Sequence, residues 1–578
     1  MAVVKYFSSR LSPSAFLAVG LTVLFLLPVL SGVVSVVLPA FNIMPALGFT
    51  NFSVAPWLNL LVTPKLSEML FLTFSTSVFS TLLSLLLALG AVSALWGTPL
   101  WRRLQHWLSP VMAVPHVALA FGIAFILMPS GVFTRLIALL AGWELPPDWQ
   151  TVNDAFGLSM ILLLVIKETP FLILMLLTAL VQVPVSGTLK LGASLGFQPM
   201  TIWVKLIWPQ LYPMIRLPVY TVLAFSISVV DIALILGPTN PPTFAVQILQ
   251  WIQDPDLSSR LLAAAGSLLL LMLVALCISA FYLSEIIAKR SLRHWMTNGD
   301  RGRFSDVSMT LFRAIWKSVL LVFSLSAITL LIWSFVWRWR FPSLWPDWSL
   351  RSWERAWNGL IEPVVNSLKV GLAASMLATV FAVVLLELIN LQRRKHKTLG
   401  IKLSLFSSFA MYAPLLLPQM TFLFGIQILL LEYQLEGYWS TVVGVHLLFV
   451  LPYCFLSLSG PWRHYDQRQS LQGLLLSQSR LKTFFQIKLM MLWRPLMASI
   501  ALGFAVSIAQ YLPTLFASAG RIETVTTEAV GLVSGGNRRL IGVYGLVQMI
   551  LPFLAYAVAF LLSNWTVKNG RITGRMNR

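Results

Sequence analysis

Apolar residues in this chain occur in long blocks separated by short polar loops, and twelve of these blocks are long enough to cross a bilayer as helices. The first six blocks lie at roughly 14–38, 67–95, 109–128, 156–183, 208–236 and 260–285. The second six lie at roughly 317–337, 364–391, 403–429, 440–460, 495–518 and 541–565. The pattern predicts an all-α polytopic membrane protein with about twelve transmembrane helices.

Composition and charge support this class and predict an orientation. With 58% apolar and 11% charged residues, the chain cannot form an ordinary water-solvated surface. Loops on the side of the N-terminus carry 28 Lys/Arg residues and the opposite loops carry 10. Basic residues favour the cytoplasmic side, so both termini are predicted to be cytoplasmic. The net charge of +21 is then a topology signal, and no nucleic-acid partner is needed to explain it.

Two further features remove alternatives. The N-terminal block follows Lys5 and Arg10, is too long for a signal peptide and lacks a convincing cleavage site, so we expect a retained first span. Cys277 and Cys454 fall inside apolar spans, and no histidine lies at ligand spacing to another His, Cys or acid. We therefore predict neither a disulfide nor a metal site.

The two halves of the chain repeat each other weakly but in the same order. In the third span Pro115 precedes a glycine by seven residues, and in the ninth span Pro418 does the same. The fourth and tenth spans share Pro170 and Pro452. Because each half has six spans, the copies share one orientation, and the natural substrate route lies between them. We expect modules at 1–300 and 301–578.

The most informative repeated segment is the loop 190–209, KLGASLGFQPMTIWVKLIWP, which recurs 281 residues later at 471–490. Gly192 pairs with Gly473, and Trp203 pairs with Phe484. The first copy predicts a short surface helix, a turn and a second helix. Pro199 suits the break, and Pro209 suits the first turn of the next span. An ordinary interfacial loop with Trp, Lys and Pro is the alternative.

This loop resembles the "EAA" loop of ABC-importer permeases, in which a glycine precedes a proline by thirteen residues, as Gly196 and Pro209 do here. The resemblance implies a coupling helix that docks into a cytoplasmic ATPase and transmits its closure to the spans. Lys190 stands where the family has its glutamate. In the second copy Ser477 replaces the glycine and Met490 the proline, so this copy is degenerate.

Over nearly its whole length the chain resembles the fused permeases of thiamine and iron(III) importers, and most of all a bacterial branch without an assigned substrate. The resemblance implies a transport subunit of the bacterial inner membrane. Its implied partners are an ABC ATPase, expected to be a dimer, and a periplasmic substrate-binding protein. The chain has no G-x-x-x-x-G-K-[ST] phosphate loop, so ATP is expected to be used by the partner, with no cofactor bound here. SGGNRR at 534–539 echoes an ATPase signature, but it lies on the predicted outside.

Ionisable groups within the spans are the candidates for the substrate path, because they are costly in a bilayer. Asp231 lies in the fifth span, and Gln510 occupies nearly the same point of the eleventh. Lys167 and Glu168 are adjacent, point in different directions and are expected to bond neighbouring helices. Interhelical hydrogen bonding without a transport role is the alternative for Asp231 and Gln510. Glu387 lies near a span end, where we expect it to snorkel with little functional weight.

The loops leave two questions open. The external loops are rich in Trp. An aromatic belt at the membrane interface explains this composition. The alternative is that loops such as 237–258 contact a periplasmic binding protein. The basic loop 286–316 is expected to link the halves and fix topology. A twelve-span secondary transporter driven by an ion gradient is the alternative to the importer. The sequence contains no nucleophile, metal or paired-acid constellation that would support a membrane-embedded enzyme.

Overall fold

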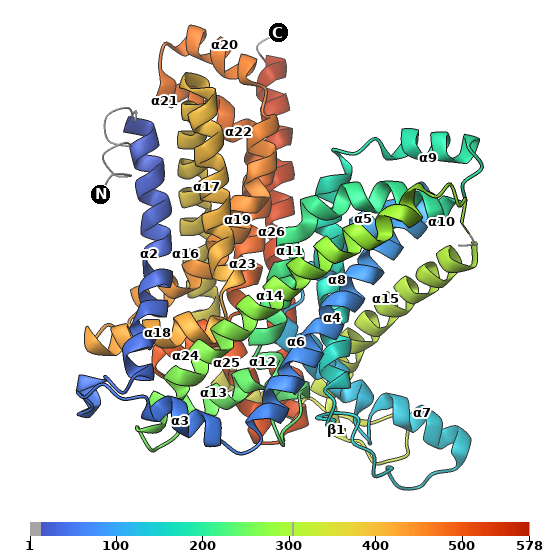
Figure 1. Cartoon of the computed structure of the whole chain (residues 1–578), viewed down its shortest axis with the longest axis vertical. Helices are drawn as coiled ribbons and strands as arrows, with labels where there is room; N and C mark the ends of the chain where they lie inside the picture. The colour runs from blue at the N-terminus through green and yellow to red at the C-terminus, as the bar shows by residue number, and fades with distance from the viewer. Residues whose placement is uncertain (1–12, 303–305, 577–578) are drawn as a thin grey trace.

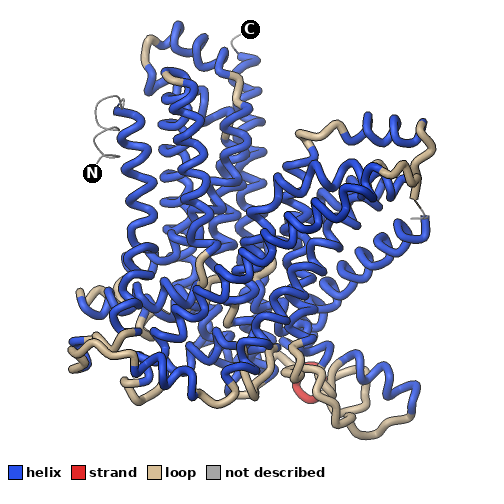
Figure 2. Tube along the Cα trace, in the orientation of Figure 1, coloured by secondary structure: helices blue, strands red, loops and turns tan. Residues whose placement is uncertain are grey.

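A computed structural model describes residues 13–302 and 306–576, so Lys5 and Arg10 lie outside the described residues. The described part is almost entirely helical (Figure 2). Its strands are β1 (Val336–Arg338) and β2 (Asp347–Trp348), which pair antiparallel in a small hairpin. The expected all-α polytopic class is confirmed.

The first half of the chain, residues 13–302, contributes these elements: α2 (Pro13–Ala40), η1 (Pro45–Leu47), α3 (Ala55–Val62), α4 (Leu66–Leu95), α5 (Pro99–Ala113), α6 (His116–Leu127), α7 (Val132–Ala141), α8 (Leu158–Leu180), α9 (Val185–Ser194), α10 (Pro199–Ile202), η2 (Trp203–Ile207), α11 (Trp208–Ser228), α12 (Asp231–Leu236), α13 (Phe244–Gln253) and α14 (Ser259–Thr297). The second half, residues 306–576, contributes α15 (Asp306–Ser334), α16 (Arg351–Lys395), α17 (Lys397–Leu416), α18 (Gln419–Glu432), α19 (Trp439–His464), α20 (Gln467–Ser477), α21 (Arg480–Thr483), η3 (Phe484–Lys488), α22 (Leu489–Met491), α23 (Trp493–Ile508), α24 (Leu512–Ser518), α25 (Val525–Ser534) and α26 (Arg538–Met576).

Eleven helices of the described part are long and apolar enough to cross a membrane, and a bent pair, Arg480–Met491 with Trp493–Ile508, makes up to twelve. The number agrees with the sequence, but four predicted spans are not continuous. The third and ninth break before α6 and α18, where Pro115 and Pro418 are the N-terminal caps. The fifth and eleventh break before α12 and α24. The breaks recur at equivalent points, as the predicted repeat requires.

The halves exchange their first helices. Helix α2 packs against α16, α17 and α18 of the second half as well as α14 of its own half, and α15 packs against α4 and α6 of the first half as well as α26 of its own half. Figure 1 shows the exchange, with blue α2 at one edge beside the second-half helices and yellow-green α15 at the other edge beside α4. Each half therefore completes its helical bundle with a helix from the other half.

Glycines allow the exchanged helices to approach closely. A Cβ on Gly122 of α6 would lie 2.4 Å from the carbonyl oxygen of Ser326 in α15. A Cβ on Gly425 of α18 would lie 1.7 Å from the carbonyl oxygen of Gly32 in α2. Both clashes are with backbone, which cannot rotate away. The Pro–Gly spacing found in the sequence thus combines a helix break with a site of close helix packing.

Figure 1 shows that the connecting segments lie at two opposite ends of the molecule. Helices α9 and α20 lie at the end where α2 begins and α26 finishes, whereas α3, α7 and β1 lie at the opposite end. We call these the loop end and the hairpin end. The two copies of the repeated loop therefore share one end of the bundle with both described chain ends.

Candidate functional site

The first copy of the repeated loop forms α9, a turn and α10, as the sequence predicts. Gly196 ends the turn with φ +80°, a backbone conformation that favours glycine, and Pro199 is the first residue of α10. Gly192 is buried where α9 crosses α10, and a Cβ there would lie 2.6 Å from the side chain of Ile202. Pro209 is the second residue of α11 and is exposed. These residues fix the shape of the loop.

The π-helical turn η2 anchors this loop to the body of the protein. Trp203, its first residue, is 1% exposed, and its ring centre lies 6.1 Å from that of Trp96, the residue directly after α4. The ammonium group of Lys205 donates to the Asn298 side chain at 3.1 Å and to the Asp300 carbonyl at 2.6 Å. The linker between the halves therefore holds the first loop in place.

The second copy has the same order of elements, α20, a turn, α21 and the π-helical turn η3, but its turn differs in detail. Gly473 is buried, and a Cβ there would lie 2.1 Å from the side chain of Ile487, so this glycine, like Gly192, lies in a close contact within its loop. The left-handed residue is Gln478, with φ +50°, one position after Ser477, which aligns with Gly196. The Ser477 hydroxyl instead bonds the Thr483 hydroxyl at 2.9 Å. Serine thus acts as a local bridge where glycine turns the chain in the first copy.

A partly buried ion pair anchors the second loop. Lys488, the last residue of η3, is paired with Glu387 of α16, and the Trp462 ring nitrogen donates to the same carboxylate at 3.1 Å. Phe484, the first residue of η3, packs against the Trp462 ring at 6.4 Å. The sequence prediction that Glu387 only snorkels is wrong, because this carboxylate tethers the loop. Each copy thus fastens a buried lysine, but to a different element.

Both loops display apolar side chains at the loop end of the molecule. Leu191 on α9 and Leu195 directly after it are 63% and 55% exposed, and Leu475 and Leu476 on α20 are 80% and 87% exposed. The two loops therefore expose apolar side chains at the same end of the molecule.

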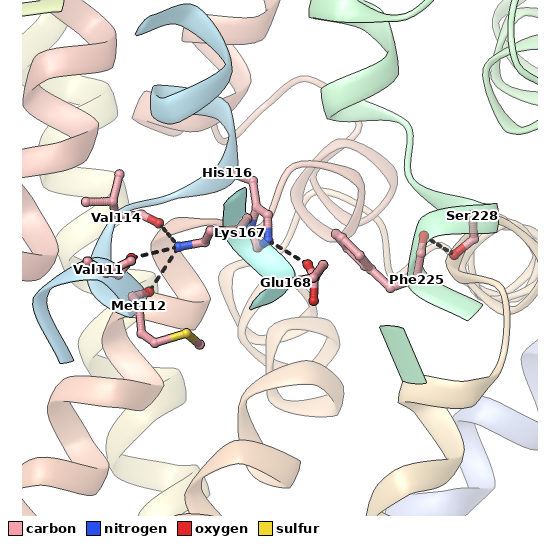
Figure 3. A network of polar contacts seen from close by, with 8 residues as sticks. All are labelled: Val111, Met112, Val114, His116, Lys167, Glu168, Phe225 and Ser228. Atoms are coloured by element: carbon pink, nitrogen blue, oxygen red, sulfur yellow. Dashed lines mark hydrogen bonds and ion pairs between the residues drawn. The ribbon is translucent and has the colours of Figure 1, made fainter. Parts of the chain in front are cut away.

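Polar groups gather deep in the bundle around the break before α6. Figure 3 shows Lys167 of α8 directed at the end of α5, where its ammonium group donates to the carbonyl oxygens of Val111 and Met112 at 3.2 Å and to that of Val114. These carbonyls have lost their helical partners at the break. Lys167 is therefore a cap for the broken helix, and the expectation that it bonds a neighbouring helix is confirmed.

Removing this cap should destabilise the protein. Lys167→Met keeps the length and apolar stem of the side chain but leaves three buried carbonyls without a donor, so we expect a loss of about 2 to 4 kcal/mol. Thermal unfolding of the purified protein in detergent measures the change. Lys369→Met, at an exposed lysine above the Trp439 ring, is the matched control and should change little. Equal unfolding temperatures for both variants would contradict the capping role.

Glu168 points the other way and meets His116, the first residue of α6, with 3.6 Å between the carboxylate and ring nitrogen (Figure 3). The His116 ring also packs against Phe225 of α11 at 5.3 Å. Sequence reasoning missed His116, although its position directly after Pro115 could have marked it as the first residue after a break. The pair joins α8 to α6 beside the centre of the molecule.

Asp231 and Gln510 lie at the two equivalent breaks in the fifth and eleventh spans. Asp231 is the first residue of α12, and Gln510 lies between α23 and α24. Both are partly exposed. Asp231 is within electrostatic reach of His116 and of Tyr511 from the second half. The breaks thus bring polar groups of both halves to the interface between them.

Tyrosines of the second half lie near the acidic groups of the first half. Tyr453 of α19 is within electrostatic reach of Glu168 and of Tyr412 in α17. Like Tyr511, both tyrosines are partly exposed. The interface therefore has charged groups on its first-half side and phenol groups on its second-half side, an arrangement that suits a polar passage.

The loop at 237–258, considered above as a contact for a binding protein, is mostly buried. Residues 244–253 form α13, which packs against α14 and α4. Only the turn at 253–258 is exposed along its whole length. Outside that turn, Thr239, Asn240 and Gln250 are the other exposed residues of this loop.

Comparison with known proteins gives one informative relative. The chain is 31% identical over 523 residues to the inner membrane ABC transporter permease protein YnjC of Escherichia coli (strain K12), covering 90% of this chain and 92% of that protein. No family model matches the chain. No solved structure matches it.

Proposed function

The chain belongs to the family of inner-membrane ABC transporter permeases, and from this we propose that it is a two-module membrane part of a binding-protein-dependent importer. Modules 1–300 and 301–578 would form one substrate path between them. The permease assignment itself agrees with the all-α fold and the candidate spans. The relative does not favour the alternative of an ion-driven secondary transporter.

The observation that carries the proposal is the pair of equivalent loops at one end. Both run from a surface helix through a tight turn into a π-helical turn that is anchored by a buried lysine. A rigid helix fixed to a span in this way moves with it, so closure of a partner can be transmitted to the interface between the halves. The exposed leucines of α9 and α20 supply the apolar contact for that partner.

The proposed partners follow from this arrangement. An ABC ATPase dimer would bind both loops and use ATP, and a periplasmic substrate-binding protein would deliver substrate at the hairpin end. The lipid bilayer would surround the spans, and both termini would be cytoplasmic, since the start of α2 and the end of α26 share the loop end. Asp231, Gln510, Lys167 and Glu168 would contribute to the path or to its support. The substrate is best identified by mass spectrometry of the ligand retained on the binding protein.

The test separates the loops from the rest of the fold. We expect the ATPase to co-purify with the wild-type chain. Replacing Leu191, Leu195, Leu475 and Leu476 together by Asp should reduce its recovery about ten-fold or more, because apolar side chains at the centre of a contact dominate binding. Leu145→Asp, at a leucine 79% exposed in the loop after α7, is the control and should leave recovery unchanged. Uptake that persists without any ATPase and collapses with the proton gradient would overturn the proposal.

A further inference from the structure

The hairpin end holds a cavity that the transport proposal does not use. It has a volume of about 480 Å³ and lies between the end of α15, β1 and the start of α26. SGGNRR at 534–539, which echoes an ATPase motif in the sequence, supplies one wall. The other wall contains Trp333, Trp337 and Trp339.

Four arginines line this cavity, Arg338, Arg340, Arg538 and Arg539, and none of its lining residues is acidic. Among the described residues, no carboxylate forms an ion pair with any of the four. Aromatic rings hold two of them in place: the Arg539 guanidinium lies 5.3 Å from the centre of the Trp337 ring, and that of Arg538 lies 5.9 Å from the Trp333 ring. A guanidinium stacked on a ring keeps its N–H edge free to bind an oxyanion. The cavity is therefore arranged for a negatively charged group.

The distribution of charge shows that this cluster is unusual. The loops on the hairpin side carry ten Lys/Arg residues. Seven of them lie around this one cavity or stack on its tryptophans, namely the four lining arginines together with Arg135, Arg351 and Arg355. Basic residues are disfavoured on the external side of a membrane protein, so their concentration at one point needs a local cause.

The equivalent junction in the other half has no such cluster. Helices α2 and α14 correspond to α15 and α26, so the matching site lies where α2 ends at Ala40 and α14 begins at Ser259. Arg260 is the only arginine within ten residues of either helix end there. Joining the two helices does not by itself require the arginines.

The position of the cavity indicates what would fill it. Only 28% of the residues in the apolar windows of α15 and α26 are buried, against 67% for α8, so these two helices face lipid. The cavity lies where they leave the membrane, at the level of lipid headgroups, among tryptophans typical of that level. Helix α26 also begins at Arg538, and the partial positive charge at a helix N-terminus adds to the attraction for an anion.

We propose that this cavity binds the phosphate of an anionic phospholipid from the leaflet at the hairpin end. The guanidinium groups would donate to the phosphate oxygens, the acyl chains would lie along α15 and α26, and the indole rings would border the headgroup. The site would hold a lipid beside α15, the helix that the second half inserts into the first.

The test uses the full chain purified with its ATPase. Lipid retained after detergent exchange is measured by native mass spectrometry, with equal amounts of phosphatidylglycerol and phosphatidylcholine offered. The wild type should retain phosphatidylglycerol preferentially. Arg338→Gln, Arg340→Gln and Arg539→Gln combined should lower this preference about ten-fold or more. Lys289→Gln, Arg290→Gln and Arg293→Gln combined, at exposed basic residues of the loop end, are the matched control and should keep it.

Three results would overturn the proposal. The first is equal retention of phosphatidylglycerol by the arginine variant and the wild type. The second is displacement of the lipid by inorganic phosphate at the same concentration, which would assign the cavity to a free anion. The third is lipid retention that is unchanged in the arginine variant while docking of the binding protein is lost, which would assign the arginines to that partner. ATPase recovery is measured alongside, so failure of the lipid site and failure of the transport proposal are told apart.

Discussion

Replacing Gly425 by leucine is expected to leave almost no folded protein in the membrane. This glycine lies where α18 crosses α2, and even a methyl group would lie 1.7 Å from the Gly32 carbonyl oxygen. Because the contact is with backbone, the helices must separate, and we expect a cost of about 3 kcal/mol or more. The crossing also joins the two halves, so the damage reaches beyond one helix pair. The yield of monodisperse protein in detergent measures the effect.

A matched control is available in the same half. Gly444 in α19 has open space where a Cβ would lie, so Gly444→Leu should be recovered at wild-type yield. Gly122→Leu, at the equivalent crossing of α6 and α15, should behave like the Gly425 variant. Normal yield and unfolding temperature for Gly425→Leu would show that the halves do not depend on this exchange.

The sequence predicted the repeat well, because its markers have local causes. Pro115 and Pro418 end one helix and begin another by the restriction that proline places on the backbone. Gly192 and Gly473 are small because a helix crosses over each of them. The structural role of such residues can be predicted from the local sequence, because the constraint lies within the loop or turn itself.

Other features could not be read in this way. The exchange of α2 and α15 could not be predicted, because the sequence of an apolar span does not show which helices it will pack against. His116 and Glu387 gain their roles from partners 52 and 101 residues away. The break before α12 has no proline or glycine, so an apolar pattern alone predicts a continuous span. Long-range packing decides all of these.

The loops also show why the two modules are unequal. The first loop is held by the linker through Lys205, whereas the second is held by α16 through Lys488. The two loops thus have different supports, although each support includes a buried lysine of a π-helical turn.

Asp231→Ala is expected to reduce uptake about ten-fold or more while the complex with the ATPase stays intact. The carboxylate is a partly exposed charge at a helix break between the halves, near His116 and Tyr511. Such a charge is costly to keep in the membrane, and the interface it faces is the proposed path. Uptake in proteoliposomes of the compound identified on the binding protein measures the loss, and ATPase recovery reports assembly.

Asp231→Asn separates the two roles that remain for this residue. Asparagine keeps the size of the side chain and can still accept hydrogen bonds from the start of α12, but it removes the charge. If the charge serves the path, the Asn variant should lose uptake as the Ala variant does, with an unchanged unfolding temperature. Gln510→Ala, at the equivalent break, removes no charge and should have the smaller effect. Full uptake by Asp231→Asn together with lowered stability of Asp231→Ala would instead assign the residue to helix capping. The His116–Glu168 pair would then be the remaining candidate for the path.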